Sequence, residues 1–226
     1  MKAEIQAIAH MKSDFPTKFG IPRQSGLVDE LRSTIIFEPD FRNPDALRGI
    51  DGYSHLWIIW QFSQAVRQDW SPTVRPPRLG GNTRMGVFAT RSPFRPNSLG
   101  LSCVRLLSVE DTKEFGTVLH VGGADLMDGT PIFDIKPYIP YSDAHPEAVG
   151  GFTDHAGDFL LEVNCPENLL NQLPEEKRQA LLGVLSHDPR PSYQRDFQRV
   201  YGLSFAGYDV RFVVRDGILT VTEITR

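Results

Sequence analysis

The residues best suited to chemistry in this sequence are arginines in its middle third. Between Trp70 and Val109 the chain has no Asp, Glu or Lys, and its charged side chains there are Arg75, Arg78, Arg84, Arg91, Arg95 and Arg105. A guanidinium presents a planar fork of donors that pairs with phosphate or carboxylate through two hydrogen bonds and stacks on bases. The stretch therefore indicates an anionic ligand. The alternative is that these arginines pair with acids elsewhere in the chain.

Glycine and proline surround these arginines. Residues 79–84 read Leu-Gly-Gly-Asn-Thr-Arg, and residues 88–97 read Phe-Ala-Thr-Arg-Ser-Pro-Phe-Arg-Pro-Asn. Glycine lets the backbone approach a ligand closely, and proline stiffens a loop so that its side chains are placed before the ligand arrives. We expect residues 71–83 to form a long loop, and loops of that length in compact domains are usually functional.

Three carboxylates lie within ten residues, at Asp125, Asp128 and Asp134. They could be a general acid and base of the kind used in sugar hydrolysis. They could also accept hydrogen bonds from ribose hydroxyls or an ammonium group. A calcium loop is not indicated, because its alternating Asp spacing is absent. The simplest alternative is that Asp128-Gly129 only forms a turn, and the segment alone does not decide among these.

The histidines and cysteines give weaker signals. His55 falls in an apolar strand segment, where a lone histidine is more often a core residue than a catalytic one. No two histidines are spaced to share one helical face, so a zinc site is not expected. Cys103 and Cys165 lie far apart and suggest reduced thiols of a cytoplasmic protein. Neither Gly-x-Ser-x-Gly nor Gly-x-Gly-x-x-Gly occurs, which argues against an α/β-hydrolase and a Rossmann-type nucleotide site.

The elements that must position these residues are mostly short strands. We expect strands at residues 3–9, 33–37, 53–62, 84–90, 100–109, 117–122 and 131–135. Strands separated by Gly, Pro, Asn and Asp clusters are typical of a barrel or sandwich. Residues 174–186 predict a helix, and Asp216-Gly217 predicts a hairpin turn. We therefore place a boundary near residue 150, between a β-rich domain (1–150) and a small α+β domain (151–226).

Length and composition exclude several classes of protein. The chain has 226 residues, 40% hydrophobic and 23% charged, which is ordinary for a soluble globular protein. Its longest apolar run is five residues, at 56–60, whereas a membrane span needs about 20. No membrane partner is expected. The net charge of −4 argues by itself against a nucleic-acid partner, but the local arginine stretch argues for one.

Several long motifs, taken in order, resemble the TsaA-like (TrmO) family of tRNA N6-methyltransferases. They are Pro-Arg-Gln at 22–24, Tyr-Ser-His-Leu-Trp at 53–57, the segment 74–82, the segment 86–97 and the segment 125–138. The resemblance is dense over residues 1–140. It continues more weakly into Asp-Pro-Arg-Pro-Ser-Tyr at 188–193.

The resemblance implies a fold, a reaction and partners. The fold would be mainly β, a single-sheet β-barrel with a small C-terminal α+β domain, working as a homodimer. The reaction would transfer a methyl group from S-adenosylmethionine to N6 of threonylcarbamoyladenosine, next to the anticodon of threonine tRNA. The absence of a Rossmann signature agrees with this, because the family does not use that site.

The family's cofactor contacts carry over to a defined set of positions in this sequence. They are Pro22, Arg23, Gln24, His55, Leu56, Arg91, Leu101, Asp128, Gly129, Thr130 and Pro131. In this reading an Arg holds the methionine carboxylate, an Asp meets the ammonium or ribose, and the backbone at Leu101 reads an adenine edge. His55 and Asp125 are candidates for handling the N6 proton, although solvent could suffice.

Contacts to RNA are expected from both domains. Arg84 and Arg95 would reach the phosphates of the anticodon stem, together with Arg190 and Tyr193 from the C-terminal domain. Two other functions remain possible from the residues alone. One is an RNA-binding module without activity, and the other is an Asp-dependent hydrolase acting through the carboxylates of residues 125–134.

Overall fold

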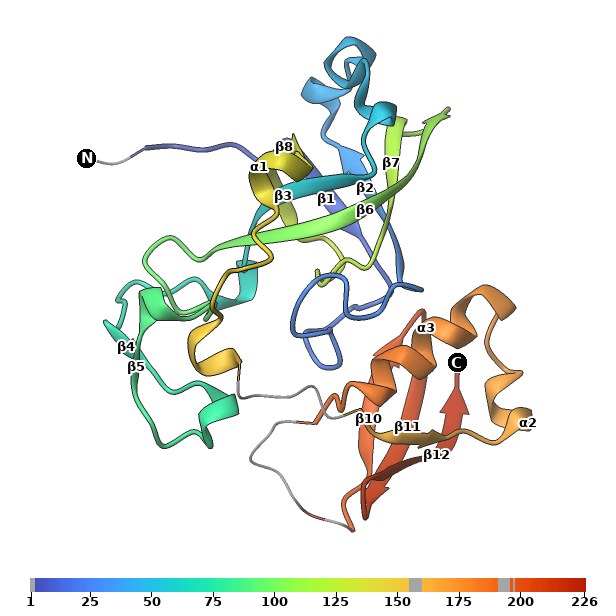
Figure 1. Cartoon of the computed structure of the whole chain (residues 1–226). Coiled ribbons are helices and arrows are strands. Elements are labelled where there is room, and N and C mark those ends of the chain that lie inside the picture. The colour runs from blue at the N-terminus through green and yellow to red at the C-terminus, as the bar shows by residue number, and fades with distance from the viewer. Residues whose placement is uncertain (1–2, 155–159, 191–195, 197) are drawn as a thin grey trace.

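A closed six-stranded barrel and a separate four-stranded sheet make up most of the chain (Figure 1). The structure is a computed structural model, and it describes residues 3–154, 160–190, 196 and 198–226. The strands pair in the order β1-β2-β7-β6-β3-β8, and β8 pairs with β1 to close the ring. The barrel strands are β1 (Ala9–Lys12), β2 (Arg32–Phe37), β3 (His55–Gln61), β6 (Leu99–Thr112), β7 (Gly116–Gly122) and β8 (Pro131–Pro137). The expectation of a mainly β chain is confirmed.

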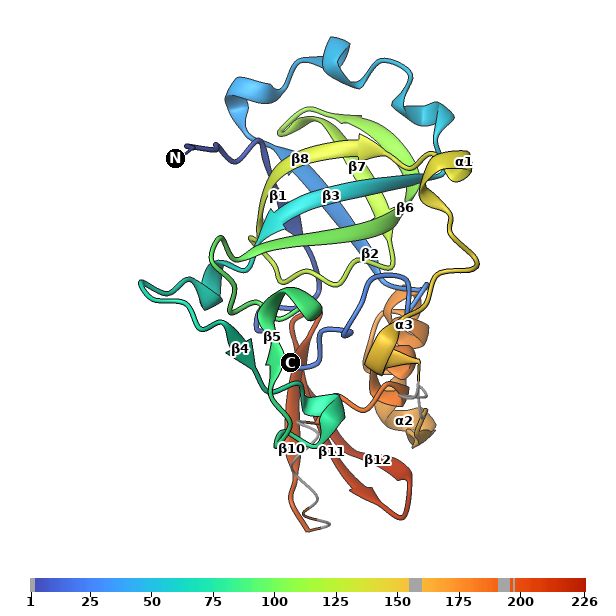
Figure 2. The same cartoon turned by 60° about the vertical axis from the view of Figure 1, so that its left-hand side comes forward.

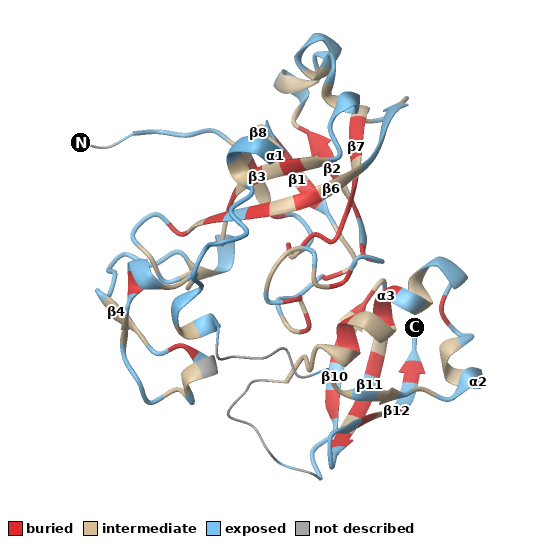
Figure 3. Ribbon diagram, viewed as in Figure 1, coloured by how far each residue is buried: buried red, intermediate tan, exposed pale blue. Residues whose placement is uncertain are grey.

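Alternation along the strands fills the barrel. In β3, Leu56, Ile58 and Trp60 are buried, while the residues between them are half-buried on the outer face. Residues from all six strands contribute to this core, and the buried positions are red on the ribbon in Figure 3. The sequence predicted a strand apolar on both faces, and the outer face is indeed partly covered. There the indole Nε1 of Trp57 donates to Asp143 at 2.9 Å.

The Trp60 ring occupies space that is open because the residue opposite it on the neighbouring strand is a glycine. Gly100 pairs with Trp60, and a Cβ at Gly100 would lie 2.3 Å from the indole. The ring therefore lies directly against the β6 backbone. Its Nε1 donates to the hydroxyl of Ser102, two residues farther along β6, at 2.9 Å.

An arm leaves the barrel between β3 and β6. It contains η4 (Ser63–Ala65), β4 (Thr73–Val74), η5 (Pro77–Leu79), β5 (Met85–Gly86) and η6 (Val87–Ala89). The long loop expected at 71–83 is present, interrupted by the short β4 and η5. The strand predicted at 84–90 is wrong, because only two residues pair before the chain turns into η6. The strand predicted at 3–9 is also wrong, because pairing with β2 begins only at Ala9.

The remaining short elements connect the strands. They are η1 (Pro39–Phe41), η2 (Pro44–Leu47), η3 (Ile50–Gly52), α1 (Pro140–Asp143) and η7 (Gly151–Thr153). Among the described residues, no helix is long and apolar enough to span a membrane. Cys103 and Cys165 are both free thiols.

The C-terminal unit is a sheet covered by a helix. Its strands run in the order β10-β11-β12-β9, from β9 (Glu162–Asn164), β10 (Tyr201–Phe205), β11 (Tyr208–Arg215) and β12 (Ile218–Thr225). The helices are α2 (Glu167–Leu170) and α3 (Glu175–Ser186), the latter as predicted. The predicted hairpin is also present, and both turn residues, Asp216 and Gly217, have positive φ.

The core beneath α3 is shared with the first part of the chain. Phe15, Val28 and Leu31, from the loop between β1 and β2, are buried among side chains of α3 and the C-terminal sheet. Phe15 meets Phe205 edge to face, with ring centroids 5.5 Å apart. Both views place the C-terminal sheet at the same end of the barrel as this loop (Figures 1 and 2). The loop therefore joins the two units.

An ion pair reinforces this junction. The ammonium of Lys177, on α3, lies 2.7 and 2.8 Å from the two carboxylate oxygens of Asp14. Both side chains are largely buried, with 23% and 12% of their surfaces exposed. A partly buried carboxylate that loses its only cation keeps the desolvation cost without the compensating attraction.

We expect Lys177→Met to lower the free energy of unfolding by about 1–3 kcal/mol, because it leaves Asp14 unpaired. Thermal unfolding followed by circular dichroism measures this. Lys113→Met, in an exposed turn, is the matched control. The double variant Asp14→Asn/Lys177→Met should lose less than the sum of the two single changes. Equal stability of the Lys177 and Lys113 variants would contradict the assignment.

Candidate functional site

The loop that precedes β2 meets the arginine-rich arm at one point. The guanidinium of Arg91 donates to the side-chain oxygen of Gln24, across 67 residues of sequence. The Gln24 amide nitrogen in turn donates to the carbonyl of Arg23. Pro22 is buried and Arg23 is exposed, so the loop is anchored while its cation faces solvent. The structure thus brings together Arg91 and the 22–24 segment.

A buried carboxylate lies beside this contact. Ser102 Oγ donates to Asp125 Oδ1 at 2.6 Å, and Trp60 donates to the same Ser102 oxygen. Burial raises the pKa of Asp125 above its ordinary value. The hydrogen bonds from Ser102 and from the backbone amides of Asp125 and Ser25, with the charge of Arg91, offset only part of that rise. The charge of Asp125 is therefore only partly compensated by its hydrogen bonds and by Arg91.

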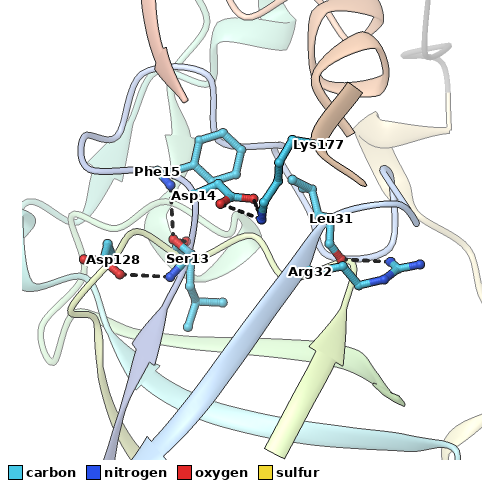
Figure 4. A network of polar contacts seen from close by, with 8 residues as sticks. Ser13, Asp14, Phe15, Leu31, Arg32, Asp128 and Lys177 are labelled. Carbon is cyan, nitrogen blue, oxygen red and sulfur yellow. Dashed lines mark hydrogen bonds and ion pairs between the residues drawn. The ribbon is translucent and has the colours of Figure 1, made fainter. Parts of the chain in front are cut away.

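The turn at residues 128–131 is held by the strand that leads into the C-terminal junction (Figure 4). The amide of Ser13 donates to Asp128 Oδ1 at 2.9 Å, and the amide of Asp128 donates to the carbonyl of Phe15. Met11 exchanges backbone hydrogen bonds with Gly129 and Thr130. Ser13 Oγ adds a bond to the carbonyl of Leu126. Met11, Ser13 and Phe15 thus bind this turn, while Asp14 and the ring of Phe15 contact the C-terminal unit.

Three of the expected cofactor residues lie apart from the cluster formed by Gln24, Arg91 and Asp125. Leu56 is fully buried inside the barrel. Leu101 lies on the outer face of β6, where 57% of its surface is exposed. His55, on the outer face of β3, contacts Ser54 and the ring of Tyr138. Within the described part of the chain, no hydrogen bond, ion pair or ring contact joins any of the three to Gln24, Arg91 or Asp125.

The arginines of the acid-free stretch are not neutralised internally. Among the five whose side chains are described, none forms an ion pair with a carboxylate of the described residues. Arg84 is exposed. Arg95 instead donates to the carbonyls of Thr90 and Ser92, so it braces its own loop. The alternative of pairing with acids elsewhere is therefore not supported.

The two RNA contacts expected in the C-terminal unit are Arg190 and Tyr193. Arg190 forms a two-point ion pair with Asp188, at 2.8 and 2.9 Å, and only 14% of its side chain is exposed. The hydrogen bond that Arg190 donates to Asp188 raises the pKa of Arg190 above its ordinary value, although burial opposes the rise. Tyr193 lies outside the described residues.

A cavity of about 270 Å³ opens next to the 22–24 loop. Its walls are residues 18–23 on one side and Val184 with residues 187–190 on the other. His55, Arg91 and the 128–131 turn do not line it. The cavity therefore lies at the junction of the two units, beside the cluster around Arg91 and not within it.

The three carboxylates of residues 125–134 have separate roles. Asp125 binds Ser102, Asp128 binds the backbone of Ser13, and Asp134 pairs with Lys136 at 2.9 Å. No two of them share a contact, so a paired acid and base for hydrolysis is not favoured. Within the residues that the structure describes, no group of three or more His, Cys, Asp or Glu is placed to hold a metal ion.

Sequence reasoning missed the residues that support the site. The backbone of Ser13 donates to Asp128, and the backbone of Ser25 and the hydroxyl of Ser102 donate to Asp125. Trp60 in turn donates to Ser102. Serine is common and its spacing carries no signal. A detectable hint was Gly100, two residues before Ser102, because a glycine inside a strand often marks a close approach.

Comparison with known proteins decides the family. Residues 10–144 match the tRNA-methyltransferase O N-terminal domain, and residues 159–226 match the TrmO C-terminal domain. The chain belongs to the TrmO family. The TrmO relatives include the tRNA (adenine(37)-N6)-methyltransferase of Escherichia coli K12, 40% identical over 221 residues that cover 94% of each chain. The protein of that name from Eikenella corrodens is 44% identical over 76% of this chain and 97% of its own.

Other TrmO relatives extend the comparison. A probable S-adenosyl-L-methionine-binding protein from Methanothermobacter thermautotrophicus is 35% identical over 61% of this chain and 91% of its own. The crystal structure of TrmO from Pseudomonas aeruginosa superposes with a TM-score of 0.80 at 32% identity, and all of each chain is covered. The expected family and the mainly β architecture are thus confirmed.

We expect the charge of Asp125 to destabilise the folded protein at neutral pH. Because the folded-state pKa lies above the unfolded value, the contribution of Asp125 to stability is greatest below the unfolded pKa, near 4, and is lost as pH rises through the folded pKa. Asn carries no charge and keeps an acceptor for Ser102. Asp125→Asn should therefore melt at a higher temperature than the unchanged protein at pH 7.

The gap in melting temperature should narrow as pH falls toward 4. Differential scanning fluorimetry over this range measures it, with Asp40→Asn, an exposed carboxylate, as control. A gap that stays constant across the range would show that the effect of the substitution is unrelated to the titration of Asp125.

Proposed function

We propose that this protein is an S-adenosylmethionine-dependent methyltransferase that acts on N6 of adenine 37 in tRNA. The observation that carries the proposal is the convergence of Gln24, Arg91 and the buried Asp125, from three segments that are distant in sequence. The homologues named tRNA (adenine(37)-N6)-methyltransferase support the same activity. An RNA-binding module without activity would not need a buried, only partly compensated carboxylate beside Arg91.

The chemistry of the cluster fits S-adenosylmethionine. Arg91 suits the methionine carboxylate, and Gln24 holds its guanidinium in place. Asp125 suits the ammonium or sulfonium cation, because a cation would offset the cost of burying its charge. Pro22 and Arg23, with Asp128, Gly129, Thr130 and Pro131, would form the walls of the site. When bound, the cofactor supplies an activated methyl group on sulfur, so the protein mainly aligns it with the acceptor nitrogen.

Of the two candidates for the N6 proton, Asp125 is the one in the cluster. Ser102 fixes the orientation of its carboxylate, which is an acceptor for a proton from the methylated nitrogen. His55 lies on the outer face of the barrel with Ser54 and Tyr138. We therefore assign the proton to Asp125 and leave His55 a binding role.

More specifically, the proposed substrate is threonylcarbamoyladenosine in the anticodon loop of threonine tRNA. Residues 1–150 would form the methyltransferase domain, and residues 151–226 would contact tRNA. Arg84, Arg95, Arg190 and Tyr193 are the proposed RNA contacts, of which Arg84 has the freest guanidinium among those described. The free thiols suit a reducing compartment, so we place the protein in the cytoplasm.

We expect Arg91→Ala to weaken S-adenosylmethionine binding by about 10- to 150-fold, the usual cost of losing a hydrogen bond to a charged group. Isothermal titration calorimetry measures it. Arg48→Ala, which removes an exposed ion pair with Asp45, is the control. In parallel, mass spectrometry of threonine tRNA nucleosides should show loss of the N6-methyl group in cells without the protein. Unchanged methylation there would refute the proposed function.

The outer face of β6 supports the proposed homodimer. Leu101 and Leu107 are 57% and 38% exposed on this face, which is unusual for large apolar residues in a sheet. A second copy on this face would bury them. It would also give the outward-facing His55 and Leu101 a cofactor to contact, that of the second copy.

We expect Leu101→Asp to convert the dimer to a monomer, because it places a charge in an apolar interface. Sedimentation velocity measures the association state. Ile5→Asp, equally exposed at 59% but outside the barrel sheet, should leave it unchanged. A monomeric unchanged protein at micromolar concentration would refute the dimer.

A further inference from the structure

The arm displays two aromatic rings to solvent. Trp70 is 51% exposed and Phe88 is 71% exposed, although both are large and apolar. Their ring centroids lie 6.0 Å apart, with the planes inclined by 33°. The two rings therefore form one continuous aromatic surface, which we call the aromatic platform.

The fold of the arm fixes this platform in place. The short β4–β5 ladder pairs Thr73 with Gly86, and the amide of Val87 donates to the carbonyl of Pro72 at 2.9 Å. Val87 is only 1% exposed, so it anchors η6 and leaves the next residue, Phe88, pointing outward. The rings are thus held by backbone pairing, and their exposure follows from the local structure.

Two arginines flank the ladder beside the platform. Arg75 follows Val74 and Arg84 precedes Met85, and Val74 and Met85 are paired. The arginines therefore occupy facing positions at the end of the ladder, where like charges repel. Both are exposed, and neither has a hydrogen bond or ion pair with any of the described residues. An external anion would relieve the repulsion.

The platform lies close to the methyl-transfer site along the chain. Phe88 is three residues from Arg91, whose guanidinium contacts Gln24. The intervening residues are fixed, since Thr90 Oγ1 donates to the carbonyl of Val87 at 2.9 Å. A molecule on the platform would therefore be a neighbour of whatever the Arg91 cluster binds.

We propose that the aromatic platform stacks an unpaired nucleotide of the substrate RNA, next to the target adenine, while Arg75 and Arg84 hold its phosphates. This inference rests on the proposed function. Exposed rings beside uncompensated arginines are how proteins bind single-stranded nucleic acid, because every base offers a face for stacking and every linkage a negative charge. The absence of any Asp, Glu or Lys from residue 70 to 109 favours RNA over a protein partner.

The test uses the full-length protein and the anticodon stem-loop of threonine tRNA. We expect Trp70→Ala and Phe88→Ala each to weaken RNA binding by about 5- to 150-fold, the range for loss of one stacked base. Trp70→Phe should retain most of the affinity. Tyr141→Ala, which removes a ring that is 92% exposed on α1, is the matched control. S-adenosylmethionine binding, followed by calorimetry, should stay unchanged in all four variants.

Salt dependence tests the arginines separately. The double variant Arg75→Ala/Arg84→Ala should reduce the slope of log affinity against log salt concentration by about 0.7 per arginine, the value for single strands. Unchanged RNA affinity and salt slope in these variants would overturn the platform. So would a change in association state that accounts for the lost binding, since the surface would then join two protein copies. Failure of the unchanged protein to methylate tRNA would refute the proposed function itself.

Discussion

The segment from Met11 to Phe15 is the constraint on which the arrangement depends. Its backbone holds the 128–131 turn, its Asp14 binds Lys177 on α3, and its Phe15 fills the core of the C-terminal unit. Within this short segment Ser13 binds Asp128 while the next residue, Asp14, binds Lys177 (Figure 4). The turn and the C-terminal unit are thus held by adjacent residues of one segment. Docking of the C-terminal unit and the shape of the cofactor turn are therefore coupled.

Charge in this protein is separated and not balanced locally. Among the described residues, ion pairs lie on the barrel strands, in their connections, at the junction and in the C-terminal unit, whereas the arm keeps its described arginines free of carboxylates. Uncompensated guanidiniums repel one another, so such an arrangement lowers stability unless an anion binds. Proline in the arm limits the entropy lost when that anion arrives. The arm is thus arranged for binding at the expense of its own stability.

Asp125 shows the same principle inside the molecule. Its charge is buried at a cost, and Ser102 and the Ser25 amide repay only part of it. Trp60 fixes Ser102, and Gly100 makes room for Trp60, so the position of this carboxylate follows from packing within the barrel. A site that holds charge in want of a counter-charge is preorganised for a cationic ligand. The methyl donor proposed here carries such a charge on its sulfonium.

The sequence by itself determined the chemical character of the protein. The acid-free arginine stretch, the Asp216-Gly217 hairpin, helix 174–186 and most barrel strands followed from composition, turn residues and apolar patterning, which are local properties. Motif resemblance added the family. The local sequence pattern did not predict strand ends that depend on pairing with another strand. The strand expected at 84–90 is reduced to the two residues of β5 that pair with β4, and β1 begins only at Ala9, where pairing with β2 begins.

Only the tertiary structure decided which residues meet. It joined Gln24 to Arg91, placed Ser102 against Asp125, and turned His55 and Leu101 to the outer face. It also paired Arg190 with Asp188 and left Arg84 exposed, although both were expected from their motifs to contact RNA. The physical reason is that such contacts depend on the register of a closed sheet and on the path of long loops. Neither is encoded by the spacing of residues within a single segment.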